Sequence, residues 1–407
     1  MHQQRTPRLI ISVRNPEEVP SWITNVLDLR GGLVLPKTKA EFDSAPSSAW
    51  LPHSTPLRES FKPVPSQGKV EGPVLVDMQS VNVSYGNREV CGSSLTFTAH
   101  SYSTTRSSKI SIGKSELATV GTYKARMVSN LPPPPSQYDL NYSTGSGKTT
   151  LLALVTGDHP QSFVQDHLLL PAYSTATKKG PTHLSTTTSP LSIDKKQRNK
   201  VPSAHLRSLI GVVSPEMFDA FPRRHPGMSV WEAIGTGFDG GYVPRTRNAP
   251  PRTPGGVDWV DVSEEECGMV YPNLNKEDPN YEQALESLRN WRVARTWEVL
   301  QALGPAAWAT DGVECQSTRT FAERSFSSLS PAEQRLVLLM RALVGRPPLV
   351  LLDEVWSGMD DRMIMAAREY LRGNGIGEDQ AVVVITHWED EVPWTGGEVQ
   401  KFMLRSN

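Results

Sequence analysis

The sequence lacks a long apolar run. No stretch approaches the roughly 18 residues that a membrane-spanning helix needs. Arg5 and Arg8 lie near the N-terminus, but no apolar signal core and no small-residue cleavage site follow them. We therefore expect no direct membrane insertion; if the protein serves a membrane, another chain must supply the membrane part.

Cysteine is scarce and the charge is balanced. Cys91, Cys267 and Cys315 are odd in number, far apart and without metal-ligand spacing, so we expect reduced thiols. The 42 basic and 43 acidic residues give a net charge of −1, which favours neither nucleic acid nor an anionic membrane as a partner. These features predict a soluble intracellular protein of the cytoplasm, with the mitochondrion as the alternative compartment.

Core-forming residues are also few, at 38% of the chain, beside 33 prolines and 30 glycines. The 407 residues suffice for two or three domains of roughly 150 residues each. This composition predicts globular structure with long irregular stretches. The stretches expected to be irregular are a linker at 36–71 and segments near 99–143, 171–205 and 244–280.

Regular elements are expected between these stretches. Alternating apolar residues predict strands between 74 and 85. The apolar run at 349–352 predicts a buried strand. Because predicted strands alternate with predicted helices, the fold class is α/β. The remaining expected elements are helices at 148–156, 230–236, 280–303, 331–344 and 360–372, and a last strand at 382–386.

The two ends of the chain resemble each other. A short strand at 9–11 is followed by Pro and Glu residues, and the stretch from Leu9 to Pro20 aligns without a gap with Val382 to Pro393. The match predicts that residues 1–35 are the remnant tail of a first domain whose body is missing, and that 72–407 form a second domain.

A phosphate-binding loop is predicted at 145–150, with the sequence GSGKTT. Its glycines allow successive backbone N–H groups to face phosphate oxygens, its lysine reaches the outer phosphates, and the next hydroxyl binds Mg²⁺. The helix that starts there adds its positive end. The structural alternative is a Gly-Ser turn that opens a helix.

The loop departs from the full pattern on its N-terminal side. Tyr142 stands where a glycine is expected, and residues 131–141 with their four prolines do not supply the apolar strand that leads in. We expect residues near 99–143 to be a foreign insertion, such as unspliced sequence, that displaced this strand.

Two acids end the predicted buried strand. An apolar strand that ends in Asp353 and Glu354 is costly unless the acids have partners or a function. In a phosphate-loop ATPase the first acid holds Mg²⁺ and the second can polarise the attacking water. The alternative is a strand end that meets solvent.

Two further features sit at helix and strand ends. Ser330, Pro331 and Glu333 form a capping box, which alone explains a helix start. The same N-terminus can also bind a γ-phosphate. His387 directly follows the last strand; a lone histidine is usually structural, but ligands of open α/β sheets bind at such strand ends.

These motifs together resemble the ABC-type ATPase domain. Their order is an aromatic residue at 85, GSGKTT at 145–150, LSPAEQ at 329–334, LVLLDE at 349–354, SGMD at 357–360 and a terminal histidine. The stretches GDHPQ at 157–161 and IGVVSPE at 210–216 look like the branch of soluble tandem ABC proteins of the molybdate type and photorepair type, with relatives that lack membrane spans. The resemblance covers about 72–404. It implies a P-loop fold with a mixed sheet, an antiparallel β subdomain and a helical signature subdomain.

The resemblance assigns roles to the matching positions. Tyr85 would stack on adenine, Glu354 would be the general base, and His387 would contact the γ-phosphate. Ser330, Glu333 and Gln334 would complete a site on a second ABC domain, with Asp360 at that interface. The phosphate and Mg²⁺ contacts would come from Gly145, Ser146, Gly147, Lys148, Thr149, Thr150 and Asp353, of which Thr149 and Asp353 would hold the metal.

Several positions depart from the family pattern. Pro215 stands where glutamine is usual, with Glu216 next to it. Pro331 and Ala332 replace the two signature glycines, which narrows the approach to a phosphate. In the N-terminal repeat, Arg14 aligns with His387.

The resulting prediction is a soluble ATPase (Walker A and Walker B motifs, P-loop hydrolase) that binds ATP and Mg²⁺. It would close head-to-tail with a second ABC ATPase domain, from a homodimer or a partner chain. The first alternative is a degenerate nucleotide-binding protein with little or no activity. The second is the ATP-binding subunit of a transporter whose permease is a separate chain.

Overall fold

The computed structural model divides the chain into two compact units, Met1–Gly68 and Lys69–Asn407. The strand predicted at 9–11 lies outside the residues that the structure describes. The described residues are 23, 25–30, 33–43, 74–85, 88–100, 108–113, 148–174, 181, 184–222, 228–244, 257–309, 317–377, 379–386, 391–394 and 399–402.

The first unit contains a hairpin and a short helix. Strands β1 (Asn25–Arg30) and β2 (Leu33–Thr38) pair antiparallel, with Arg30 opposite Leu33 across the two-residue link Gly31-Gly32. Helix α1 (Lys39–Asp43) follows at once. Residues 36–43 are therefore regular, which differs from the linker expected at 36–71.

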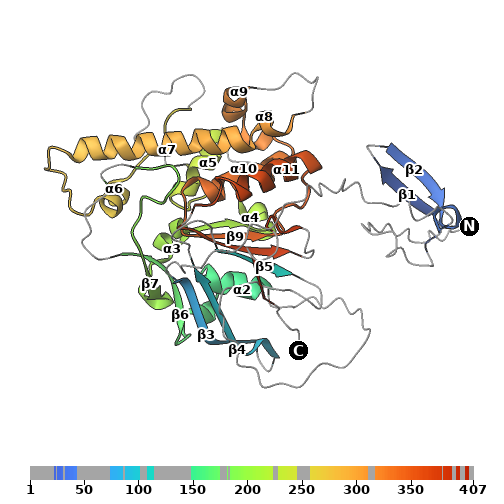
Figure 1. Cartoon of the computed structure of the whole chain (residues 1–407), viewed down its shortest axis with the longest axis horizontal. Helices are drawn as coiled ribbons and strands as arrows, with labels where there is room; N and C mark the ends of the chain where they lie inside the picture. The colour runs from blue at the N-terminus through green and yellow to red at the C-terminus, as the bar shows by residue number, and fades with distance from the viewer. Residues whose placement is uncertain are drawn as a thin grey trace, which may run out of the picture. The chain divides into compact units, whose positions relative to one another are not determined.

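A five-stranded sheet forms the centre of the second unit, with strand order β11-β5-β10-β9-β8. Every pairing between its strands is parallel. Figure 1 shows this sheet between α2 on one side and α10 and α11 on the other. The strands are β5 (Ser108–Gly113), β8 (Ile210–Val213), β9 (Leu349–Asp353), β10 (Ala381–Thr386) and β11 (Val399–Phe402).

Strands β9 and β10 are buried on both faces of the sheet, and their side chains alternate between two cores. Leu349 and Leu351 of β9 pack in a core with α2 (Lys148–Val155), whereas Val350 and Leu352 pack in a core with α10 (Pro331–Val344). This explains why β9 and β10 are almost continuously apolar in sequence. Helix α11 (Asp361–Arg372) packs in the second core as well.

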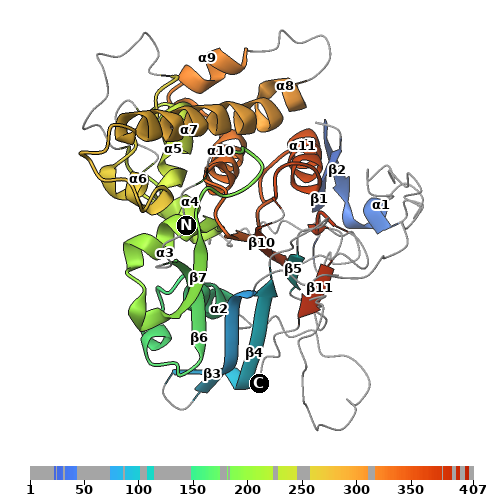
Figure 2. The ribbon, with the colours of Figure 1, turned by 60° about the vertical axis from the view of Figure 1, so that its left-hand side comes forward.

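A second, antiparallel sheet packs with α2, with strand order β4-β3-β6-β7. Figure 2 shows its strands side by side next to that helix. Buried residues of β3 and β6 complete the core around α2. The strands are β3 (Val74–Tyr85), β4 (Arg88–His100), β6 (Leu168–Tyr173) and β7 (Ile193–Gln197).

The long helix α7 (Tyr281–Leu303) lies with α10 and α11 on the face of the parallel sheet opposite α2. Among the described residues, no helix is both long and apolar enough to span a bilayer. The other helices are α3 (Ser203–Leu209), α4 (Pro215–Ala220), α5 (Val230–Gly235), α6 (Glu264–Val270), α8 (Pro305–Trp308) and α9 (Thr318–Glu323), with short 3₁₀ turns η3 (Pro160–Phe163), η4 (Arg198–Lys200), η5 (Thr236–Phe238) and η6 (Phe326–Ser328).

The predicted α/β fold class is confirmed. The helix expected at 148–156 is confirmed as well, and so are the helices and strands expected after residue 230. Three stretches expected to be irregular contain regular structure. Strand β5 lies within 99–143, β7 lies within 171–205, and α6 lies within 244–280. Their local sequences are polar, and pairing with distant strands or a capping box stabilises them instead.

Candidate functional site

The carboxyl ends of the parallel strands meet at one edge of the central sheet. Ile385 of β10 is in register with Asp353 of β9, and Val213 of β8 is in register with Leu352. On the other side of β10, Thr386 is opposite Gly113, the last residue of β5. Segments that follow these strands therefore leave the sheet at a common edge, where ligands of open α/β sheets bind.

The acid pair lies at this edge, as the sequence predicted for a strand end. Asp353 is the last residue of β9 and is only 7% exposed. Glu354 follows with φ +47°, a left-handed backbone conformation. For a residue other than glycine this conformation costs about 1–3 kcal/mol and persists only where the surrounding structure holds it. Of the two neighbouring acids, Asp353 is buried and Glu354 is partly exposed.

Strand β5 is one strand of the central sheet that the sequence did not predict. It lies between β10 and β11, parallel to both, and ends at the same edge as the acid pair. Residues 108–113 lie within the stretch expected to be a foreign insertion, and they form a strand of the central sheet. The local sequence SKISIG has too few apolar residues to signal a buried strand, and its pairing with β10 is non-local.

Part of the predicted phosphate loop belongs to the described structure. Lys148, Thr149 and Thr150 form the first turn of α2, as expected for this motif, and Thr150 is partly exposed. The leucines of α2 pack in the same core as Leu351 of β9 and Ile385 of β10. The three residues before α2, namely Gly145, Ser146 and Gly147, lie outside the described residues.

The predicted signature segment begins α10 as a capping box. The Ser330 hydroxyl accepts a hydrogen bond from the Glu333 backbone N–H at 3.3 Å, and the Glu333 carboxylate accepts one from the Ser330 N–H at 2.7 Å. Arg324 forms an ion pair with Glu333 at 3.1 Å. Ser330 is exposed, whereas Gln334 is buried and donates to the Phe326 carbonyl at 3.1 Å.

Asp360 caps the next helix. Its carboxylate accepts a hydrogen bond from the Met363 backbone N–H at 2.8 Å, at the start of α11. Gly358 precedes it with φ +76°, so this turn uses a conformation that favours glycine. Asp360 therefore caps α11 while it is exposed at the protein surface.

The segment after β8 also caps a helix. The Ser214 hydroxyl accepts a hydrogen bond from the Met217 N–H at 3.1 Å, and Pro215 occupies the first position of α4. Glu216 is exposed in the first turn of the same helix. Pro215, which stands where the family has glutamine, therefore serves to start α4.

Two residues with predicted ligand contacts, Tyr85 and His387, have no described side chain. Tyr85 is the last residue of β3, opposite Arg88 of β4, and nothing is described of its side chain. His387 lies outside the described residues, directly after β10. The role of each residue stays a prediction.

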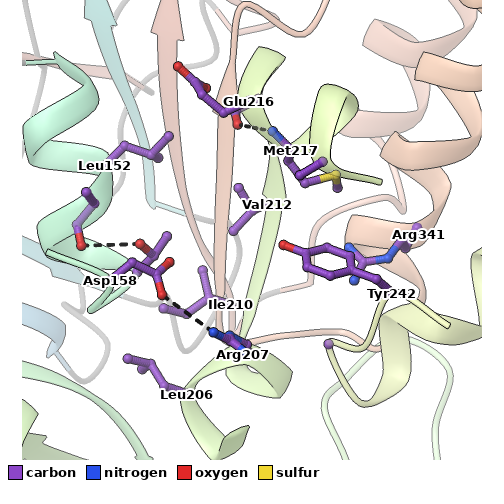
Figure 3. A pocket seen from close by; sticks show the side chains of 15 residues that line it. Leu152, Asp158, Leu206, Arg207, Ile210, Val212, Glu216, Met217, Tyr242 and Arg341 are labelled. Carbon is purple, nitrogen blue, oxygen red and sulfur yellow. Dashed lines mark hydrogen bonds and ion pairs between the residues drawn. The ribbon is translucent and has the colours of Figure 1, made fainter. Parts of the chain in front are cut away.

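A pocket of about 270 Å³ is lined by residues of α2, α3, β8 and α4, among others. The C-terminal half of α2, including Leu152, forms one wall of the pocket. Figure 3 shows Tyr242 reaching across the pocket toward β8, with Arg341 against its ring and the Asp158–Arg207 ion pair below. Burial lowers the pKa of Arg341 to about 10.

The residues present fit a magnesium ion of the kind that P-loop proteins bind. The buried carboxylate of Asp353 is a hard oxygen ligand, which Mg²⁺ prefers. The described part of the chain contains no group of three or more histidine, cysteine or acidic side chains that could hold a metal alone. Mg²⁺ needs no such group, because it is usually held by one or two carboxylates together with substrate phosphates and water.

The sequence analysis missed a set of contacts beside the acid pair. The Trp356 indole N–H donates to the Glu391 carbonyl at 2.6 Å, and the Thr386 hydroxyl donates to the Glu391 carboxylate. The available signal was the buried-type tryptophan two residues after Glu354. Its partner lies 35 positions further along the chain, so no local pattern could identify the pair.

The comparisons with known proteins agree on one family. The family model described as "ABC transporter" matches residues 142–357, more than half of the chain. An ABC transporter ATP-binding protein of Schizosaccharomyces pombe is 25% identical over 401 residues, which cover 97% of this chain and 57% of that protein. A Saccharomyces cerevisiae protein of the same description is 21% identical over 396 residues, covering 95% and 56%. The chain thus spans little more than half the length of these relatives.

Among solved structures, the chain matches the crystal structure of a nucleotide-free ATP-binding cassette from an ABC transporter. It is 13% identical, with a TM-score of 0.37, and the match covers 79% of this chain and 83% of that one. The extent of the family match decides the assignment: this chain belongs to the ABC transporter family and carries its P-loop ATP-binding domain.

Proposed function

We propose that this chain binds and hydrolyses ATP at the carboxyl edge of its parallel sheet. The observation that supports this most is the alignment of strand ends at that edge. Asp353 ends β9, Glu354 follows it, and β5 and β10 end beside them. An ATPase needs its phosphate contacts and its base on one such edge.

In this proposal, different residues of the chain bind the phosphates, contact the adenine and activate the water. Lys148 and the first turn of α2 bind the β- and γ-phosphates, and residues 145–147 present backbone N–H groups. Tyr85 contacts the adenine. Glu354 accepts a proton from the attacking water, and His387 contacts the γ-phosphate. When bound, Mg²⁺ held through Thr149 and Asp353 would neutralise the phosphate charge.

A second ABC ATPase domain completes the site in this proposal. Ser330 is exposed at the N-terminus of α10, where backbone N–H groups and the helix dipole favour an anion. Asp360 is exposed at the start of α11 and would lie at the shared interface. We also propose that residues 1–35 are the tail of a first ABC domain and 72–407 the second, joined without a membrane-inserted segment.

Nucleotide binding tests the first part of the proposal. Lys148→Ala should weaken equilibrium binding of ATP at least about tenfold, because it removes the cation that faces the outer phosphates. Lys200→Ala is the matched control, since Lys200 is exposed on η4. Equal affinity in the two variants would contradict the predicted phosphate loop.

Mixing two variants tests the head-to-tail arrangement. If two copies of this chain close around ATP, Lys148→Ala and Ser330→Ala proteins, each with low turnover alone, should regain turnover when mixed. The mixed dimer would contain one site with both residues intact. A monomer by sedimentation, with no complementation, would indicate a partner chain instead.

A specific observation favours the degenerate alternative, in which the chain binds nucleotide without turnover. Pro331 and Ala332 begin α10 where glycines are usual, and the Ser330 hydroxyl already accepts a bond from its own helix. Turnover equal to that of a variant without the base would establish this alternative.

A further inference from the structure

The turn after β9 holds Glu354 in an unusual backbone conformation. Its φ of +47° is uncommon outside glycine, so neighbouring contacts must maintain it. The Glu354 N–H donates to the Ile385 carbonyl at 3.0 Å, and the Glu354 carbonyl accepts from the Ser357 N–H at 3.1 Å. One of these bonds reaches β10, so the position of the acid depends on the neighbouring strand.

Trp356 adds a second connection from the same turn. Its indole is buried, at 6% exposure, and its N–H donates to the Glu391 carbonyl at 2.6 Å. The carboxylate of Glu391 in turn accepts the hydroxyl of Thr386, the last residue of β10. Hydrogen bonds thereby join the turn at 354–357, called the acid turn below, to β10 and to Glu391. The end of β10 precedes 387–390, and Glu391 follows them.

Residues 391–394 are themselves fixed on α11. Arg368 donates to the Val392 carbonyl at 3.2 Å, and Arg372 donates to the Pro393 carbonyl. Trp394 is buried at 4% exposure in the same core as α11. Glu391 is therefore a firmly held acceptor for the Trp356 indole.

We propose that Trp356, Thr386 and Glu391 are positioning residues for Glu354. They hold the acid turn against the end of β10, so that the Glu354 carboxylate stays in place for the attacking water. This inference rests on the proposed ATPase function. A catalytic group displaced by about 1 Å can lose about a hundredfold in rate, so a single hydrogen bond that fixes a turn can control kcat.

A purely structural role is the competing explanation, since Trp356 also fills the core. The variant Trp356→Phe distinguishes the positioning role from the structural role. It keeps an aromatic ring in the core but removes the indole N–H. Trp291→Phe is the matched control. The Trp291 indole is also buried and donates to a carbonyl, that of Ser185 at 2.7 Å, but it belongs to α7.

The experiment measures steady-state ATP hydrolysis and thermal unfolding of the full chain. Trp356→Phe should lower kcat by about tenfold or more while KM for ATP changes less than about twofold. Trp291→Phe should keep the wild-type kcat, although both variants lose a buried hydrogen bond and should lose similar amounts of Tm.

A second pair of variants keeps the test valid if Trp356→Phe does not fold. Thr386→Val removes the hydroxyl that donates to Glu391 and retains the branched shape, whereas Thr386→Ser retains the hydroxyl. We expect Thr386→Val to lower kcat and Thr386→Ser to keep most of it.

The outcomes are distinct. Wild-type kcat in both Trp356→Phe and Thr386→Val overturns the positioning role while leaving the ATPase proposal intact. A loss of kcat that is equal in Trp356→Phe and Trp291→Phe also overturns it, because the effect would then be general. A wild-type chain with no turnover above that of Glu354→Gln overturns the proposed function, and this inference with it.

Discussion

Ser330 and Glu333 cap the N-terminus of α10 reciprocally: the Ser330 hydroxyl accepts the Glu333 N–H, and the Glu333 carboxylate accepts the Ser330 N–H. The same geometry occurs in Ser263 and Glu266 at the start of α6. Comparing variants of the two capping boxes separates the effect on helix stability from the effect on the proposed contact with the ATP of a second domain.

Ser330→Ala should destabilise the chain by about 1 kcal/mol, because the helix loses its side-chain cap. Ser263→Ala should have a similar effect on chemical unfolding, since it removes an equivalent bond. Only Ser330→Ala should also lower ATP turnover, by about tenfold, if Ser330 contacts phosphate. Equal turnover in the two variants would contradict the proposed role of Ser330.

Two glycines should respond to alanine with opposite signs. A Cβ on Gly211 of β8 would lie 2.0 Å from the Ala342 carbonyl oxygen of α10, which is backbone and cannot rotate away. Gly211→Ala should therefore cost about 3 kcal/mol of unfolding free energy.

Gly268 of α6 is the matched position. Nothing lies within 4 Å of a Cβ placed there, and alanine is the better helix former. Gly268→Ala should raise the unfolding free energy by up to about 1 kcal/mol. Denaturant titration measures both changes; destabilisation by both variants would contradict the close approach of β8 and α10 as the specific cause.

Glu298 of α7 pairs with two buried arginines. Its carboxylate lies 2.6 Å from Arg295 and 3.5 Å from Arg346. Burial, and then the charge of Arg295, lowers the pKa of Arg346 to about 10, so the charged guanidinium is unfavourable in the fold without a compensating acid.

Glu298→Gln should cost about 2 kcal/mol, less than a fully buried pair because the Glu298 side chain is 29% exposed. Glu286→Gln on the same helix should change stability by less than about 0.5 kcal/mol, since Glu286 is exposed beside Arg289. Chemical unfolding of the two variants checks the difference, and similar values would refute the network.

Cys267 should be unreactive in the folded protein. Desolvation by burial is the main cause that raises the pKa of its thiol. A raised pKa keeps the thiol protonated to higher pH, so the reactive thiolate is scarcer than in the unfolded chain at about pH 8. A Cys91→Ser/Cys315→Ser variant should react with an aromatic disulfide reagent only after unfolding. Fast reaction of the native variant would show that Cys267 is accessible.

Local signals were sufficient for some elements and not for others. The Ser330-Pro331-Glu333 pattern places the start of α10 at Pro331, and the apolar run at 349–352 identifies β9, because capping and burial act within a few residues. The box formed by Ser263 and Glu266 was also in the sequence, where its acids were interpreted as part of an irregular stretch.

Other elements depend on distant partners. Strand β5 is stabilised by pairing with β10 and β11, which follow it by more than two hundred residues, and its own sequence carries little strand signal. The bond between Trp356 and Glu391 likewise exists only once β9 and β10 pair. At the candidate site, sequence motifs identified the acids at the strand ends, whereas the contacts that fix them required the fold.

The central claim is that Glu354 is the base of an ATP-hydrolysing site. The most direct measurement compares phosphate release and equilibrium ATP binding for the wild-type chain, Glu354→Gln and the control Glu369→Gln, an exposed residue of α11. The account predicts that Glu354→Gln loses turnover but binds ATP as the wild type does, while Glu369→Gln keeps both. Unchanged hydrolysis in Glu354→Gln would contradict it.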